Sequence, residues 1–250
     1  VDVMRQGGFY GFMPMHHRAE EPIVYDPPFA FVPRVLDNSA GGQVWVPEGH
    51  WDALGGRMIH LSYGRCTALL ALPDETHPGT QGAVLRLPGR YLSGAMRGRF
   101  NPLDGHLYVS GLRGWQTAAV HDGCFQRLRF VGGALRQPTR YATRAGELEL
   151  CFDVKLDRKL AEDPESYSLE QWNYLWSSQY GSKDWSIRDS KKNGRDKVAI
   201  PSTKLQPDGK TVVLSLPGLT RAMQFELKFD LDAADGEIVR GSIAGSINEL

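Results

Sequence analysis

The chain has 250 residues and a mass of 27.8 kDa, enough for one large β domain or two ordinary ones. Apolar residues make up 41% and charged residues 23%, which excludes a largely disordered chain. Lys plus Arg equals Asp plus Glu, at 29 each, so no overall field draws the chain to nucleic acid or to an anionic membrane.

The sequence contains neither a recognisable targeting segment nor a cysteine pattern typical of a metal site. No apolar run approaches the ~20 residues that a membrane helix needs, and no signal peptide is visible. The chain opens on Val1-Asp2-Val3 without a methionine, which suggests a fragment whose export signal lies upstream. Cys66, Cys124 and Cys151 are far apart and lack metal-ligand spacing, so neither a zinc site nor a disulfide framework is expected.

The sequence of the first half of the chain predicts short strands. Residues 1–36 are rich in loops, because four prolines between positions 22 and 33 exclude a long helix. Strands are expected at 43–46, 58–63, 68–72, 84–87, 106–110 and 124–130. A turn, a strand, a glycine bend and another strand are typical of a β-propeller blade. Arg65 and Arg113 each follow a strand and lie 48 positions apart, close to the length of one blade.

The pattern changes after residue 133. Residues 147–154 and 223–231 alternate strictly, and shorter strands are expected at 167–174, 198–200 and 211–216. Residues 157–166 read as a loop or one helical turn, and the small, polar tail from 233 either closes the domain or begins a linker. We therefore predict an all-β chain. Residues 1–137 are the C-terminal blades of a β-propeller, about two of them, and residues 138–250 are an Ig-like β-sandwich.

Several phrases resemble the C-terminal part of large exported bacterial multidomain proteins. The phrases are YDPP (25–28), DNSAGGQVWVPEGHW (37–51), HLSYGRC (60–66), RGRFNPLDGHLYVSGLRGWQ (97–116), DGCFQRLRF (122–130) and QWNYLWSSQYGSKDWS (171–186). Those proteins carry a propeller similar to the soluble pyrroloquinoline-quinone (PQQ) glucose and sorbosone dehydrogenases. LDRKLAEDPESYSLEQW (156–172) is similar to bacterial Ig-like modules.

The resemblance implies a periplasmic or extracellular, carbohydrate-related oxidoreductase with PQQ and calcium as cofactors. Haem would belong to cytochrome c modules outside this chain, because no Cys-x-x-Cys-His occurs in it. The catalytic histidine of the quinone dehydrogenases has no counterpart here, so a complete active site is not expected in this chain.

Arginines are the candidate cofactor-binding residues. Arg65, Arg97 and Arg113, with Arg99 nearby, follow or occupy strands whose ends would meet at a propeller funnel. There, planar guanidinium groups bind the carboxylates of a quinone or an acidic sugar. The alternative, which we favour, is salt bridging between blades. The acidic partners for such bridges are Asp104, Asp122 and Glu48.

Tryptophans are the candidate substrate-binding residues: Trp115, Trp172, Trp176 and Trp185. Trp172 and Trp176 share parity with Tyr174, so on a strand they would line one face. If exposed, this row is a platform for sugar rings. If buried, it is sandwich core or the joint between domains, which we favour because aromatic residues bury large areas at interfaces.

Metal-binding candidates are His16 and His17, although adjacent residues of an extended segment point in opposite directions. An ordered loop is the alternative for this pair. Asp184, Asp189 and Asp196 suggest a calcium loop, but their spacing does not match an EF-hand.

Three hypotheses for function follow. The first is a part of an exported, carbohydrate-related oxidoreductase. The second is a non-catalytic module that binds a polysaccharide or a protein. The third is a structural spacer between catalytic and electron-transfer modules.

Overall fold

The computed structural model describes residues 1–11, 24–175 and 181–250, which form an all-β fold. The helical elements of this part are short: η2 (Asp52–Leu54), α1 (Arg158–Ala161) and η3 (Pro164–Ser166). None of the helices in the described ranges is long and apolar enough to cross a membrane. His16, His17 and Trp176 lie outside the described residues.

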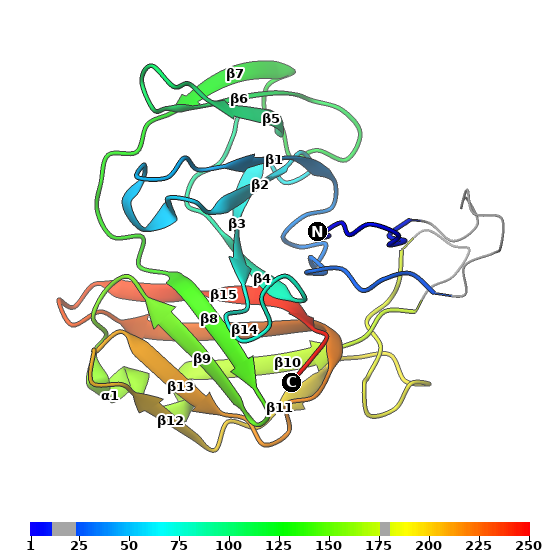
Figure 1. Cartoon of the computed structure of the whole chain (residues 1–250), viewed down its shortest axis with the longest axis vertical. Helices are drawn as coiled ribbons and strands as arrows, with labels where there is room; N and C mark the ends of the chain where they lie inside the picture. The colour runs from blue at the N-terminus through cyan, green and yellow to red at the C-terminus, as the bar shows by residue number, and fades with distance from the viewer. Residues whose placement is uncertain (12–23, 176–180) are drawn as a thin grey trace.

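Three antiparallel sheets make up the described part of the chain (Figure 1). The first has the order β1-β2-β3-β4-β15-β14-β10-β11, the second β12-β13-β9-β8 and the third β5-β6-β7. The strands of the first half are β1 (Ala40–Trp45), β2 (Met58–Ser62), β3 (Thr67–Pro73), β4 (Gly82–Arg86), β5 (Gly94–Phe100), β6 (Leu107–Leu112) and β7 (Gly123–Leu128). The strands of the second half are β8 (Pro138–Arg144), β9 (Glu147–Phe152), β10 (Tyr167–Trp172), β11 (Asp196–Val198), β12 (Ser202–Leu205), β13 (Thr211–Ser215), β14 (Ala222–Asp232) and β15 (Ile238–Ile247).

The first half consists of two meanders, β1–β4 and β5–β7, that pack against each other. Gly98 of β5 allows the close approach, because a Cβ there would lie 3.1 Å from Leu61 Cδ1 of β2 and 3.4 Å from Val44 Cγ1 of β1. Leu107 and Val109 of β6 point into this interface and are buried. The strands expected near 43, 58, 68, 84, 106 and 124 are confirmed, while β5 was not predicted.

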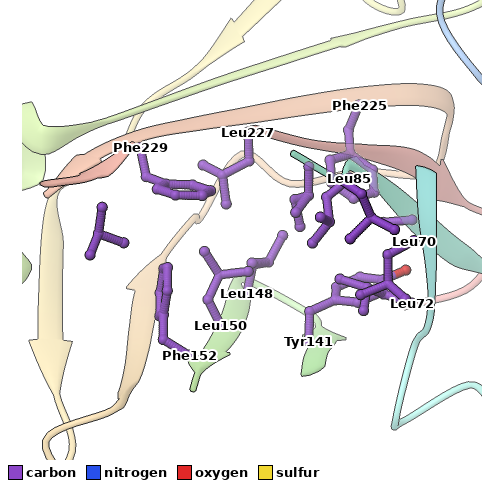
Figure 2. Close-up of a cluster of buried hydrophobic side chains, with 14 of the residues drawn as sticks. Leu70, Leu72, Leu85, Tyr141, Leu148, Leu150, Phe152, Phe225, Leu227 and Phe229 are labelled. Atoms are coloured by element: carbon purple, nitrogen blue, oxygen red, sulfur yellow. The ribbon is translucent and has the colours of Figure 1, made fainter. Parts of the chain in front are cut away.

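The second half packs the β12-β13-β9-β8 sheet against the β14 part of the large sheet (Figure 2). The alternation in 147–154 is confirmed, since Leu148, Leu150 and Phe152 are all buried. Phe152 meets Phe229 edge to face, with ring centroids 5.3 Å apart and an interplanar angle of 88°. This geometry is one that aromatic pairs prefer. The helical turn allowed within 157–166 is present as α1, capped by the Asp157 side chain.

One strand joins the two halves. Ile243 and Gly245 of β15 pair with Leu85 and Ala83 of β4, so the large sheet runs from β1 to β11 without a break. Tyr141 of β8 also packs in the same core as the β3 and β4 leucines (Figure 2). Of the two alternatives for the tail after residue 233, the structure shows the one in which it closes the domain, and the linker is ruled out. The small residues of this tail form β15, because they let β4 approach closely.

Candidate functional site

The exposed face of the β5–β7 sheet carries a grid of arginine and aromatic side chains. In one row Arg99 of β5, Tyr108 of β6 and Arg127 of β7 are cross-strand neighbours. In the next row the neighbours are Arg97, Ser110 and Phe125. Directly paired residues of an antiparallel sheet point to the same side, so all six share one face. We call it the arginine–aromatic face.

Exposure and ring contacts define this surface. The three arginines and Ser110 are exposed, and Phe125 has 72% of its surface accessible. Phe125 stacks on Tyr108 with centroids 5.5 Å apart and an interplanar angle of 24°. The Tyr108 hydroxyl donates a hydrogen bond of 2.8 Å to Asp104 Oδ2. This bond orients the tyrosine ring, so the pair forms a preset apolar patch between the arginines.

The arginines of this face bear charge without acidic partners. Arg99 Nη1 donates to the Gly98 carbonyl at 2.7 Å, and Arg97 Nη1 donates to the Met96 carbonyl at 2.9 Å. Within the described ranges, the ion pairs use other arginines and leave Arg97, Arg99 and Arg127 without an acidic side chain in range. Guanidinium groups with unused donors suit carboxylates and sulfates.

Arg65 and Arg113 do not share a partner. Arg65 Nε and Nη2 donate to the Arg34 carbonyl at 3.1 and 2.6 Å. Arg113 Nη1 lies 3.7 Å from Asp122 Oδ1, but this exposed ion pair joins the ends of the neighbouring strands β6 and β7 and is not the predicted bridge between blades. Their loops do touch, since Ala118 N donates to the Gly64 carbonyl at 2.8 Å. The two guanidinium groups are engaged separately, which does not fit a quinone carboxylate held between them.

The candidate tryptophans are in different environments. Trp115 is exposed, with 78% of its surface accessible, on the loop that follows β6. Trp172 has no exposed surface, so its ring has no face to offer a sugar and its expected role in substrate binding is corrected. Trp185 is half-buried, and its backbone pairs with Asn173.

Arg195, which sequence reasoning passed over, covers Trp172. Its Cζ lies 3.8 Å from the ring centroid, a cation–π contact. Its Nε donates to Asp184 Oδ2 at 2.7 Å, and its Nη1 lies 3.3 Å from Glu226 Oε2. Burial opposes the positive charge, but these acidic neighbours outweigh it and raise the pKa of Arg195. The cluster closes the sandwich over Trp172.

Each acidic residue of the suggested calcium loop already pairs with another group of the protein. Asp184 pairs with Arg195, Asp189 caps the turn at Lys191 N, and Asp196 accepts hydrogen bonds from Ser186 Oγ and Ile187 N. In the ranges that the structure describes, no three His, Cys, Asp or Glu side chains are grouped as metal ligands.

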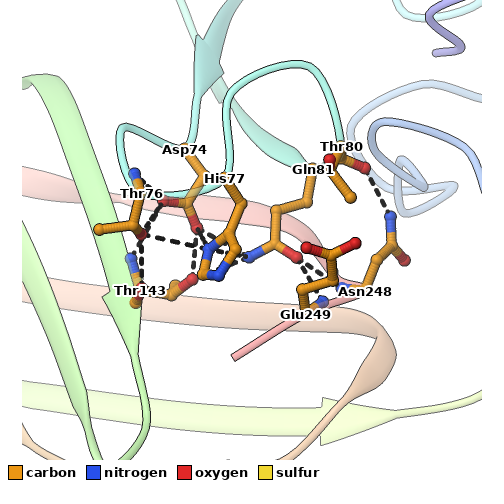
Figure 3. Close-up of polar contacts among 8 residues, drawn as sticks. All are labelled: Asp74, Thr76, His77, Thr80, Gln81, Thr143, Asn248 and Glu249. Carbon is orange, nitrogen blue, oxygen red and sulfur yellow. Dashed lines mark hydrogen bonds and ion pairs between the residues drawn. The ribbon is translucent and has the colours of Figure 1, made fainter.

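A buried polar cluster around Asp74 lies where the two halves meet (Figure 3). Asp74 accepts hydrogen bonds from Thr76 N at 2.9 Å, Gln81 Nε2 at 2.8 Å, and both the backbone and the hydroxyl of Thr143 on β8. Gln81 Oε1 in turn accepts from Asn248 N at 2.7 Å. The cluster therefore ties the β3–β4 turn to β8 and to the end of the chain, which is a structural role.

A second buried carboxylate, Asp37, holds the start of the β1–β4 meander. It accepts hydrogen bonds from Ser62 Oγ at 2.6 Å and Ser39 N at 2.9 Å, and lies 2.7 Å from His60 Nε2. His60 lies on β2 and is buried. Burial opposes ionisation of Asp37, but its hydrogen bonds with His60 and Ser62 outweigh burial and lower its pKa.

Comparisons with family models, with curated proteins and with solved structures found no match to this chain. No relative's function therefore enters the functional argument.

Sequence reasoning missed four of the six residues of the arginine–aromatic face. Tyr108, Ser110, Phe125 and Arg127 were not named as site residues. The residue types of β7 gave no signal for this face, because the apolar Phe125 is exposed whereas the polar Gln126 is half-buried. Sequence patterns also do not give the register that places these residues side by side.

Proposed function

We propose that this chain is a non-catalytic module that binds acidic carbohydrate on the arginine–aromatic face. The observation that carries the proposal is the Tyr108–Phe125 stack lying among three arginines that have no acidic partner among the described residues. A stacked aromatic pair offers a flat apolar surface to the C–H face of a sugar ring. Arginines spaced on both sides of it pair with carboxylate or sulfate groups along the chain of sugars.

The exported setting implied by the sequence resemblance supports this proposal. Acidic polysaccharides are ligands that a periplasmic or extracellular protein meets. The exposed Trp115 adds a second aromatic surface at the end of β6, beyond the grid itself.

The test is a calorimetric titration of the chain with oligogalacturonate, and with neutral cello-oligosaccharides of equal length. We expect binding of the acidic ligand alone, weakened by added salt because exposed charges are screened. Arg127→Ala and Phe125→Ala should each weaken it about tenfold, near 1.4 kcal/mol. Arg158→Ala, which removes an exposed arginine of α1, is the matched control. Equal affinity for neutral and acidic ligands would contradict the proposal.

A second candidate is a part of an exported PQQ-dependent sugar dehydrogenase-like oxidoreductase. The packing of the β1–β4 and β5–β7 meanders supports it, because propeller blades are antiparallel meanders of this kind. The sheet orders β12-β13-β9-β8 and β11-β10-β14-β15 support an Ig-like second half, since they match strands D-E-B-A and C′-C-F-G.

The two candidates differ in what covers the arginine–aromatic face. Ring closure in a propeller would place another blade on it, whereas a binding module leaves it open. Alkylation of a Ser110→Cys variant, mapped by mass spectrometry in the longest form of the protein, separates them. Rapid labelling favours the binding module, and protection favours the propeller.

A further inference from the structure

A cavity of about 600 Å³ lies between the β1–β4 meander and the β5–β7 sheet. Its deep wall is apolar and is formed by Ile59, Ala68, Leu87, Tyr91, Leu107 and Leu128. Leu107 and Leu128 alternate with Tyr108 and Arg127 along their strands, so the cavity and the arginine–aromatic face are on opposite sides of one sheet. The cavity is therefore a separate site.

Trp51 forms one side of this cavity. Its ring stacks on Phe130 with centroids 5.8 Å apart and an interplanar angle of 18°, and meets Phe100 edge to face at 5.0 Å. Trp51 and Asp52 both adopt left-handed backbone conformations, with φ of 57° and 47°. Residues other than glycine seldom adopt this conformation, and such residues concentrate at ligand sites. Here the strained turn presents the indole ring to the cavity.

The outer wall is the segment 129–134. In the part of the chain that the structure describes, these residues make no hydrogen bond, and Gly132 and Gly133 have φ of 80° and 98°. The chain is anchored immediately afterwards, because Asp153 accepts hydrogen bonds from Leu135 N and from Arg136 N. The wall is fixed at both ends, by the pairing of Leu128 with Leu107 and by Asp153, and the two glycines between these ends allow it to move aside and admit a ligand.

The residues that line the cavity indicate the chemical class of ligand that it binds. The charged groups at the cavity are Asp52, Arg129 and Asp153, and the carboxylate of Asp153 is already occupied by backbone donors. The remaining surface is apolar and aromatic. Cavities of this size and character hold drug-sized molecules. We propose that this cavity binds an uncharged, planar aromatic molecule of about two or three fused rings, stacked against Trp51 and Phe130.

The test uses a panel of neutral two- and three-ring aromatic compounds, with N-phenyl-1-naphthylamine as the fluorescent probe. We expect saturable binding of one probe per chain, with a rise in its fluorescence. Trp51→Ala removes the stacking ring, and Ala134→Trp fills the mouth of the cavity from an exposed position. Each should weaken binding at least tenfold.

Two controls keep the result interpretable. Trp115→Ala removes an exposed tryptophan elsewhere and should leave binding unchanged. Circular dichroism and thermal unfolding check that every variant is folded. If Trp51→Ala is not folded, Ala134→Trp alone tests the proposal. No saturable binding by any compound of the panel, or equal binding by wild type and Ala134→Trp, would overturn the proposal.

Discussion

At the scale of single residues, Asp74 shows how a buried carboxylate is stabilised. It has no exposed surface, and Thr76, Gln81 and Thr143 surround it with donors (Figure 3). Burying a charge without partners is costly, whereas hydrogen bonds from fixed donors offset the lost hydration. Because the donors come from the β3–β4 turn and from β8, the charge holds two distant segments together.

We expect Asp74→Asn to lower the free energy of unfolding by about 2–4 kcal/mol at pH 7. The amide presents a donor to donors and leaves at least one of them unpaired. Urea unfolding measures the change. Asp122→Asn, which alters an exposed carboxylate paired with Arg113, should change stability by about 0.5 kcal/mol or less. Similar losses in the two variants would contradict this account of Asp74.

We also expect the stability difference between wild type and Asp74→Asn to depend on pH. Burial opposes ionisation of Asp74, but hydrogen bonds from Thr143, Thr76 and Gln81 outweigh it, so its pKa lies below its ordinary value. A carboxyl group whose pKa is lowered in the folded state stabilises the fold at pH values above its pKa in the unfolded state, about 3.9. This stabilisation is lost as the pH falls through the pKa of the folded state. The stability difference between wild type and Asp74→Asn should therefore shrink below about pH 4. A difference that stays constant down to pH 3 would contradict the charge assignment.

At the scale of elements, β15 depends on small residues. A Cβ at Gly245 would lie 2.6 Å from Ala83 Cα and 2.9 Å from Ala83 Cβ on β4. Neither atom is the end of a flexible side chain, so the strands would have to separate. The pairing that joins the two halves therefore requires glycine at this position.

We expect Gly245→Ala to lower the free energy of unfolding by about 3 kcal/mol, because it overpacks a buried strand interface. Gly218→Ala is the matched control, since its new methyl group would meet only Val198 Cγ1, at 3.8 Å. Thermal unfolding compares the two variants. Equal effects would mean that the β4–β15 contact does not limit stability.

At the scale of the whole molecule, the two halves share one sheet and one core. Leu70, Leu72 and Leu85 from the first half pack with Tyr141 and Phe225 from the second (Figure 2). Opening the boundary near residue 137 would expose these side chains and an edge of the large sheet. Separate folding of the halves would leave this apolar surface in water.

We therefore expect a single unfolding transition for the chain in differential scanning calorimetry. Its calorimetric and van't Hoff enthalpies should agree, as they do for a cooperative unit. The segment 138–250 expressed alone should unfold at a lower temperature than the whole chain. Two resolved transitions, one of them matching that segment, would instead identify two independent domains.

Local patterns of the sequence predicted many of the strands, but not β5, β8, β12 or β15. Strict alternation predicted β9 and β14, because this signal depends on neighbours along the chain. Only the tertiary structure decided β15, whose small residues lack apolar alternation and form a strand by packing against β4. It also decided that Trp172 is buried and that Arg97, Arg99 and Arg127 share a face. Burial and cross-strand register depend on contacts between distant segments, which no local pattern contains.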